Sequence, residues 1–269
     1  MQLELTGHVA VVTGGASGIG LASARGLARE GCLVALWDVS ASVAEAASAM
    51  ASEFGGRAIG IVADVRDLAS VQAASRETES ALGPIQHVVH SAAVGSGKFG
   101  FPFTNLDPAD WMRVLDINIM GMVNVAQTIS GGMVERKQGT MVFIGSVAGQ
   151  IGSQTDPPYS ASKAAGINFA QCLAKDLAPH NVRVNTVNPG MVRTPLNIRV
   201  WQAWCDRQPP ELRRSYEDWA GAKVRAVAPL GRFQECEDVA DMVTFLSSAR
   251  ALQVTGQTIN VDGGQVMHW

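Results

Sequence analysis

Residues 9–20 read Val-Ala-Val-Val-Thr-Gly-Gly-Ala-Ser-Gly-Ile-Gly, and this stretch decides the fold. A run of β-branched residues at 8–12 enters a glycine-rich turn, and a helical pattern leaves the turn at 19–30. A second strand is predicted at 32–37. Together these segments form a strand–helix–strand unit, the building block of dinucleotide-binding sheets.

The same alternation continues along most of the chain and lapses between 191 and 229. Strands are predicted at 58–62, 87–91, 140–145, 183–188 and 257–261, and helices at 43–54, 68–82, 111–135, 160–177 and 236–248. Alternation of this kind requires a parallel sheet with right-handed crossovers and helices on both faces. We therefore predict one α/β domain over 1–269, a doubly wound parallel sheet of the Rossmann type, with a substrate flap at about 191–227.

Composition argues against several classes of protein. With 47% hydrophobic and 17% charged residues the chain is not disordered, and the apolar share suits a sheet buried on both faces. Its net charge of −3 indicates no partner, and the absence of a basic stripe with interleaved aromatic residues predicts no nucleic-acid binding. No leader pattern and no membrane-length apolar run is visible, so we expect a soluble cytoplasmic protein without a membrane partner. The four cysteines show no metal-ligand spacing, so no metal is expected.

The glycine turn is a candidate phosphate-binding site. A turn between a strand and a helix lets backbone N–H groups approach a pyrophosphate, and the helix N-terminus adds partial positive charge. Its spacing, Gly-x-x-x-Gly-x-Gly, differs from the commoner Gly-x-Gly-x-x-Gly, and a tight structural turn is the alternative. The residues predicted to contact the cofactor here are Gly14, Ser17, Gly18, Ile19 and Gly20.

Two acids follow predicted strands and bear on the choice of cofactor. Asp38 lies eighteen residues after Gly20, where a carboxylate accepts hydrogen bonds from ribose hydroxyls and repels a 2′-phosphate. Residues 36–39 offer no Lys or Arg to reverse this, so NAD is predicted rather than NADP. Asp64 and Val65 follow the third strand, where an adenine contact is expected. A turn or N-cap role for Asp38, and a plain strand-end role for Asp64, are the alternatives.

Ser146, Tyr159 and Lys163 form the candidate catalytic constellation. Tyr159 and Lys163 stand at i and i+4, so they share one helix face, and the ammonium favours phenolate over phenol. This predicts a lowered Tyr159 pKa and an acid/base role for its hydroxyl. A solvent-facing Tyr/Lys pair is the alternative for the pair alone. Combined with Ser146 and the glycine turn, the pair indicates a nicotinamide-dependent oxidoreductase.

These motifs resemble those of the short-chain dehydrogenase/reductase family, and the resemblance covers essentially the whole chain. The matching segments are Thr13–Gly20, Asp64, Asn118 within Asp-Ile-Asn, Ser146, Tyr-Ser-Ala-Ser-Lys at 159–163, Asn-Pro-Gly at 188–190, and Gly256 with Val-Asp-Gly-Gly at 261–264. One departure is His90-Ser91-Ala92-Ala93, where the family usually has Asn-Asn-Ala-Gly. Ser91 has a shorter reach than the usual Asn, which bears on local stability and cofactor fit.

The resemblance implies a role for each matched residue. Tyr159 would be the general acid/base, and Ser146 would hydrogen-bond the same substrate oxygen. Lys163 would hold the nicotinamide ribose and lower the Tyr159 pKa, while Asn118 would position a water that links Lys163 to solvent. The further cofactor contacts implied are Ser91, Pro189, Gly190 and Thr194.

Substrate choice is assigned to the loops at 94–103, 149–158 and 191–227, which follow predicted strands. Two sets of side chains in these loops are candidates. Aromatic residues to wall an apolar pocket are Phe99, Phe101, Phe103, Trp201, Trp204 and Trp219. Residues to bind hydroxyl groups are Gln150, Ser153, Gln154 and Asp156. Packing between the flap and the body is the alternative for the tryptophans.

Three hypotheses for function follow. The leading one is NAD-dependent oxidation of a secondary alcohol on a polyol, sugar or related hydroxy compound, because the ending at 257–267 and the long flap resemble family members with such substrates. The first alternative, a 3-hydroxyacyl or 3-oxoacyl thioester oxidoreductase, predicts a basic patch at the pocket mouth, for which Arg193, Arg199 and Arg207 are candidates. The second alternative is a non-catalytic NAD-binding regulator, which the intact catalytic set disfavours.

Assembly is predicted from the chain end and from the resemblance. The apolar residues at 266–269 are expected to be docked rather than free. The resemblance implies a homotetramer, with the last strand and the helix at 111–135 as candidate contacts.

Overall fold

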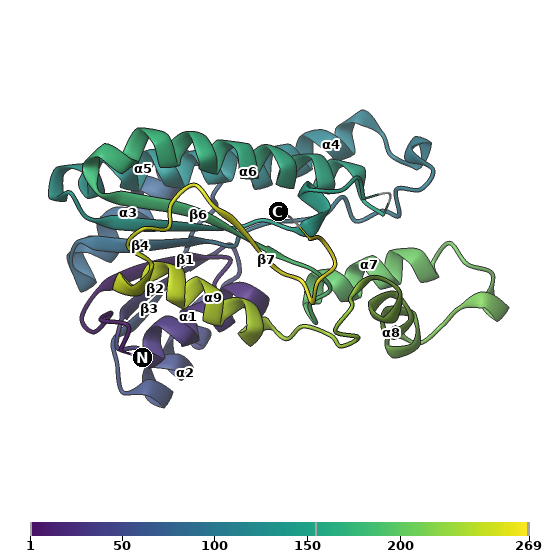
Figure 1. The fold of residues 1–269 in the computed structure, drawn as a ribbon, viewed down its shortest axis with the longest axis horizontal. Helices are drawn as coiled ribbons and strands as arrows, with labels where there is room; N and C mark the ends of the chain where they lie inside the picture. Colours follow the sequence, from purple (N-terminus) through teal and green to yellow (C-terminus); the bar gives the residue numbers. More distant parts are fainter. Residues whose placement is uncertain (1, 154, 268–269) are drawn as a thin grey trace.

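One seven-stranded sheet organises residues 2–153 and 155–267, which are those that the computed structural model describes. Every pairing is parallel, in the order β3-β2-β1-β4-β5-β6-β7 (Figure 1). The strands are β1 (Val9–Thr13), β2 (Leu33–Asp38), β3 (Ala58–Val62), β4 (Ile85–His90), β5 (Gly139–Ile144), β6 (Val182–Pro189) and β7 (Thr258–Val261). Because β4 lies beside β1 on the side away from β2, the carboxyl ends of β1 and β4 flank the switch point at which such sheets bind ligands.

Two helical layers cover the sheet (Figure 1). One holds α1 (Gly18–Arg29), α2 (Val43–Phe54) and α9 (Cys236–Ser247). The other holds α3 (Leu68–Leu82), α4 (Pro108–Leu115), α5 (Gly121–Arg136) and α6 (Pro157–Leu177). The predicted doubly wound sheet with helices on both faces is confirmed.

The alternation of side chains along β1 shows why the sheet is buried on both sides. Val9 and Val11 belong to the core beneath α3, α5 and α6, whereas Ala10 and Val12 belong to the core beneath α1, α2 and α9. Successive residues of a strand point to opposite faces, so both sets must be apolar. This burial on both faces explains the continuous apolar run at residues 9–12.

The helix predicted at 111–135 is longer and is interrupted. It begins at Pro108, where Asp107 and Asp110 form a capping box, and it ends at Arg136. A π-helical turn, Asp116–Met120, separates α4 from α5 and contains Asn118. Such turns are rare and often lie at functional sites.

The segment between 191 and 229 holds two helices that the sequence prediction missed. They are α7 (Pro195–Cys205) and α8 (Tyr216–Val227). Figure 1 shows them together beyond the ends of the strands, outside both helical layers. Ring contacts join them, with centroids 5.9 Å apart for Trp201 and Tyr216.

The chain end and several boundaries also refine the predictions. Helix α6 begins at Pro157 rather than at residue 160, which places Tyr159 in its first turn. The Val266 amide donates to Asp262 Oδ2 at 2.8 Å, but Met267 is 75% exposed. His268 and Trp269, included in the predicted docked tail, lie outside the described residues.

In the described part of the chain, no helix combines the length and apolarity needed to cross a membrane.

Candidate active site

The glycine turn after β1 has a backbone that side chains would block. Gly14 has φ +65°, and a Cβ there would lie 2.9 Å from the Ala92 amide nitrogen. A Cβ on Gly20 would lie 2.1 Å from the Gly14 carbonyl oxygen. Ser17, the N-cap of α1, makes no side-chain capping bond, so the first turn keeps N–H groups for a ligand. The turn therefore fits a dinucleotide pyrophosphate.

A cavity of about 470 Å³ lies at the carboxyl ends of the strands beside this turn. It brings together most of the predicted cofactor residues, namely Gly14, Ser17, Gly18, Ile19, Asp38, Asp64, Val65, Ser91, Tyr159, Lys163 and Thr194. Gly20 does not line it, because this glycine packs against the turn itself. Pro189 and Gly190 line a second, adjoining cavity instead.

Asp38 is fixed at the end of β2 by backbone hydrogen bonds. Its Oδ2 accepts from the Ala16 amide at 3.1 Å, and its Oδ1 accepts from the Ser40 amide at 3.0 Å. The first bond reaches across to the glycine turn. The carboxylate therefore has a set orientation in the cofactor cavity.

Asp64 is paired with a cation that the sequence prediction did not consider. Arg66 Nη2 lies 2.6 Å from Asp64 Oδ2, and these hydrogen bonds lower the pKa of the Asp64 carboxyl. Arg66 lines the same cavity, as do Arg113 and Arg199. All three residues of the Asp-Val-Arg sequence after β3 thus line the cavity, and the arginine bears on the choice between NAD and NADP.

Thr13 ties the ends of β1 and β4 where the usual family asparagine is missing. The amides of Ser91 and Ala92 each donate to Thr13 Oγ1 at 3.2 Å. His90 Nδ1 lies 3.0 Å from the same oxygen. Burial, with a smaller contribution from the Lys163 charge, lowers the pKa of His90 to about 3, so the ring is neutral. This network supplies the local support that the short Ser91 side chain does not give.

Ser146, Tyr159 and Lys163 converge at the end of β5. Ser146 is the N-cap of a 3-10 turn (Val147–Gly149), and its Oγ accepts from the Ala148 amide at 3.1 Å. Tyr159 and Lys163 stand one turn apart at the start of α6, and the Lys163 ammonium lies 5.5 Å from the Tyr159 ring centroid. The ammonium donates to the Ile144 carbonyl at 2.7 Å.

The predicted lowering of the Tyr159 pKa by Lys163 is wrong for this structure. Burial raises the pKa of Tyr159 to about 12, the hydrogen bond with Ser146 opposes the shift, and the Asp156 charge adds to it. Burial also lowers the pKa of Lys163 to about 8. The ammonium is directed to the Ile144 carbonyl, so desolvation outweighs its attraction for a phenolate.

Asn118 joins the loop after β4 to α6. Its Oδ1 accepts from the Val94 amide at 2.8 Å, and its Nδ2 donates to the Val94 carbonyl and to Ser162 Oγ, both at 2.9 Å. Ser162 immediately precedes Lys163. The asparagine side chain therefore positions the backbone next to the candidate catalytic lysine.

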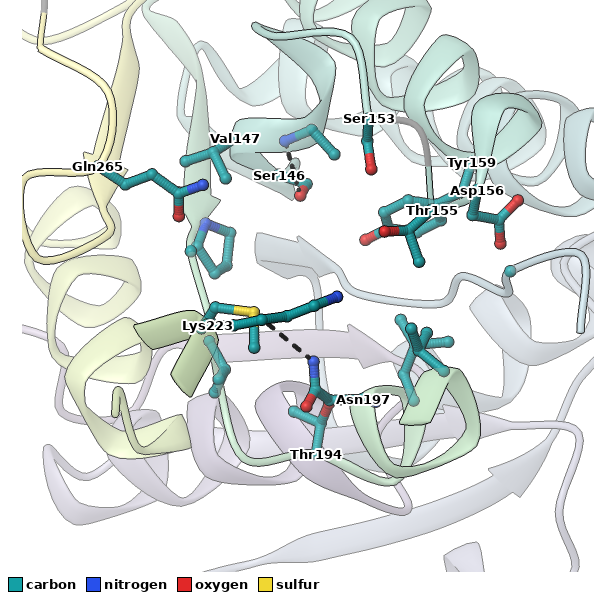
Figure 2. Close-up of a pocket in the computed structure, with 18 of the residues that line it drawn as sticks. Ser146, Val147, Ser153, Thr155, Asp156, Tyr159, Thr194, Asn197, Lys223 and Gln265 are labelled. Carbon is teal, nitrogen blue, oxygen red and sulfur yellow. Dashed lines mark hydrogen bonds between the residues drawn. The ribbon is translucent and has the colours of Figure 1, made fainter. Parts of the chain in front are cut away.

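The second cavity, of about 380 Å³, adjoins the first at Tyr159 (Figure 2). Five residues line both cavities, namely Ile19, Ile144, Tyr159, Thr194 and Leu196. The wall of the second cavity is largely apolar. Its polar side chains beyond Ser146, Tyr159 and Thr194 are Ser153, Thr155, Asp156, Asn197, Lys223 and Gln265.

Only some of the residues predicted for substrate binding line the second cavity. Of the six aromatic candidates only Trp219 is in its lining. Phe101 and Phe103 are exposed, and the ring of Trp201 packs on Tyr216 of α8, which is a contact within the flap rather than between the flap and the body. The amino-acid sequence alone does not predict which aromatic rings contact each other.

Of the polar residues predicted to bind hydroxyl groups, only some line the cavity. Ser153 and Asp156 line the cavity, whereas Gln150 does not, and Gln154 lies outside the described residues. Sequence reasoning missed Asn197, Lys223 and Gln265. The i, i+4 spacing of Trp219 and Lys223 would have placed those two on one face, had α8 been recognised as a helix.

The three arginines considered for a basic patch at the pocket mouth lie outside the lining of this cavity. Arg193 is paired with Glu217 and Glu235 and lies over the Phe233 ring. Arg199 lines the first cavity, and none of the three arginine candidates lines the second.

Two cavities that meet at a tyrosine, one of them beside a glycine turn that fits a pyrophosphate, are the arrangement expected of a nicotinamide-dependent oxidoreductase. The model of the family described as short chain dehydrogenase matches residues 8–204. The chain is 38% identical over 264 residues to 2-(S)-hydroxypropyl-CoM dehydrogenase 3 of Xanthobacter autotrophicus, covering 98% of both proteins. It is 34% identical over 265 residues to the 3-oxoacyl-acyl-carrier-protein reductase FabG of Aquifex aeolicus, covering 98% of this chain and 99% of that one.

Solved structures agree with the sequence relatives. L-sorbose reductase from Gluconobacter frateurii, complexed with NADPH and L-sorbose, superposes with a TM-score of 0.90 at 29% identity over the whole of both chains. The chain belongs to the short-chain dehydrogenase family. It is accordingly an oxidoreductase for hydroxyl or keto substrates, on a fold that binds a nicotinamide cofactor.

Proposed function

We propose that the protein is an NAD-dependent dehydrogenase of secondary alcohols, with Tyr159 as its acid/base. The observation that carries the proposal is the meeting of the two cavities at Tyr159, with Lys163 lining the cofactor side and Ser146 lining the substrate side. Polyols, sugars and related hydroxy compounds are the leading substrates. L-sorbose in the neighbour structure supports that choice.

Residues of this chain would transfer the hydroxyl proton and position the substrate and the cofactor. A bound nicotinamide would supply a hydride acceptor for oxidation and a hydride donor for reduction. Tyr159 takes the hydroxyl proton during oxidation and returns it during reduction, while Ser146 donates a hydrogen bond to the same substrate oxygen. Lys163 holds the ribose, and Asn118 supports its helix and positions the water that connects it with solvent.

Cofactor choice follows from Asp38. A carboxylate oriented by two backbone amides favours ribose hydroxyls and repels a 2′-phosphate, so we assign NAD. Arg66 is paired with Asp64, which reduces its availability to a phosphate. NADPH in the sorbose reductase structure makes the comparison of the two cofactors the necessary test. The remaining proposed contacts are Gly14, Ser17, Gly18, Ile19, Gly20, Asp64, Val65, Ser91, Pro189, Gly190 and Thr194.

The proposal extends to the organisation of the chain. The whole of 1–269 would form one cofactor-binding and catalytic domain, and the segment 191–227 would act as the substrate flap because α7 and α8 both contribute to the second cavity. We also propose a homotetramer.

The test is cofactor reduction with a substrate panel. Purified protein would receive NAD or NADP with polyols, sugars, simple secondary alcohols and 3-hydroxyacyl thioesters. We expect turnover of secondary alcohols with NAD. In Tyr159→Phe, turnover should fall by roughly 10²-fold or more while the NAD Kd changes little.

Three outcomes would contradict parts of the proposal. Full activity of Tyr159→Phe would remove the tyrosine from the acid/base role. Turnover of thioesters alone would favour the first alternative. NAD binding without turnover of any substrate would favour a regulator.

A further inference from the structure

Lys223 places a cation in the substrate cavity. The side chain extends from α8 into the cavity, between Asn197 and the side on which Tyr159 lies (Figure 2). The ammonium lies 4.1 Å from the Trp219 ring centroid, which is one turn back on the same helix. Among the residues that the structure describes, Lys223 has no hydrogen-bond or ion-pair partner.

Two other basic side chains near the site have acidic partners, unlike this lysine. Lys98 is paired with Asp107 and Asp110, and Arg193 with two glutamates. Lys223 is half-buried with only an aromatic face beneath it, and burial lowers the pKa of its ammonium. An unpaired cation in a largely apolar cavity is unfavourable in the free protein, and an anionic ligand would remove that cost.

Asp156 is the only other charged side chain in the described lining of the cavity. Its Oδ2 accepts from the Ser96 amide at 2.8 Å, and the carboxylate points away from the cavity centre (Figure 2). Burial raises the pKa of the Asp156 carboxyl. Asp156 therefore does not neutralise Lys223, and the two charges lie on different sides of the cavity.

We propose that the substrate carries an anionic group, a carboxylate or an oxyanion of similar charge, that binds Lys223 while its carbinol or keto carbon lies at Tyr159. This inference rests on the proposed function and names the substrate class of the same site. Apolar residues of the cavity lining, such as Val200 and Leu196, would contact the carbon chain that joins the two groups. Among the hydroxy compounds proposed above, sugar acids and hydroxy acids would pair with Lys223, whereas neutral polyols would leave its charge unpaired.

The first experiment compares acids with their neutral isosteres. The probes are 3-hydroxybutanoate, 4-hydroxypentanoate and 5-hydroxyhexanoate, each beside its primary amide, because the amide keeps the shape and removes the charge. We expect the wild type to favour at least one acid over its amide by roughly tenfold or more in kcat/KM. Lys223→Gln should lower that acid-to-amide ratio by roughly 10- to 100-fold, mainly through KM, because a hydrogen bond to a charged group is lost.

Two further variants separate a specific contact from general charge. Lys223→Arg should restore part of the acid preference. Arg225→Gln removes one positive charge from an exposed position on the same helix and should keep the wild-type ratio. An acid-to-amide ratio in Lys223→Gln equal to that of the wild type would overturn the inference.

A binding measurement separates the inference from the proposed chemistry. Calorimetric titration of 5-oxohexanoate and its amide into Tyr159→Phe, and into Tyr159→Phe with Lys223→Gln, needs no turnover. Tighter binding of the acid that depends on Lys223, without turnover of any probe by the wild type, would support the anion site and count against the proposed dehydrogenase. Turnover of the probes by the wild type, with binding of the acid that does not depend on Lys223, would support the proposed dehydrogenase and count against the anion site. Absence of both binding and turnover would overturn the inference.

Discussion

At the scale of single residues, the position and charge of Asp38 give the most direct prediction about the cofactor. Its carboxylate bonds to the Ala16 and Ser40 amides and lies in the first cavity. Replacing it with Ser removes the charge that repels a 2′-phosphate. We expect Asp38→Ser to lower kcat/KM for NAD by roughly tenfold and to raise it for NADP, consistent with loss of one charged hydrogen-bonding group.

The measurement is the ratio of kcat/KM for the two cofactors with one alcohol. Asp64→Asn is the matched control, because that acid is paired with Arg66 and should shift the ratio less. A wild type that already prefers NADP would show that Arg66 or Arg199 outweighs Asp38.

Buried histidines predict loss of stability in mild acid. Burial is the main cause that lowers the pKa of His87 and of His90 to about 3, from an unfolded value of 6.5. Between these values the unfolded chain binds more protons than the folded one, so stability falls as pH falls through 6.5. From pH 8 to pH 5 each ring should cost about 2 kcal/mol of unfolding free energy.

Denaturant unfolding at several pH values checks this prediction. His87 bonds to His8 and to Thr140, so His87→Asn will lower stability overall, but it should also flatten the pH dependence between 8 and 5. An unchanged slope in that variant would show that His87 is already protonated in the folded protein.

At the scale of elements, the sequence predicts what repeats and misses what depends on contacts. The β/α alternation from 8 to 188 follows from apolar runs and turns, and it is confirmed. Helices α7 and α8 escaped the prediction although their N-caps were visible. Charges are interspersed among the apolar positions of α8, whereas α7 has one charged residue, Arg199. Thr194 precedes Pro195, and Ser215 accepts from the Asp218 amide three residues on.

In the candidate site too, the sequence predicts the motif residues but not the properties that depend on tertiary contacts. Motif spacing identified Ser146, Tyr159 and Lys163, and the fold gathers them. The raised Tyr159 pKa could not be predicted from spacing, because burial depends on what covers the side chain. Lys223 was missed for a related reason, since its cavity is built by segments distant in sequence.

The π-helical turn makes a prediction about element stability. Asn118→Ala would remove three hydrogen bonds, two with the Val94 backbone and one to Ser162 Oγ. We expect a loss of roughly 3 kcal/mol and a Tm lower by about 5–10 °C. Calorimetry measures both. Asn105→Ala, which removes bonds only to the carbonyls of a surface loop, should change Tm much less, and equal effects would count against a special role for the turn.

At the scale of the whole molecule, parallel strands bring chemistry from distant segments to one edge. The turn after β1, the acid that ends β2 and the serine after β5 all lie at the carboxyl ends of strands, so one sheet edge holds both cavities. The opposite faces carry the helices. Function is thereby separated from the two cores, and substitutions in the flap can alter substrate choice without disturbing either core.

The outward stripe of α4 and α5 predicts self-association. Met112 in α4, Met120 in the π-helical turn and Gly131 in α5 are exposed, and β7 is an edge strand with no second neighbour in the described chain. Covering both surfaces with further copies would give the proposed homotetramer. Light scattering at micromolar concentration should show four times the mass of one chain. Met120→Glu should lower that mass, whereas Leu212→Glu, exposed in the flap, should not; a monomer mass for the wild type would refute the prediction.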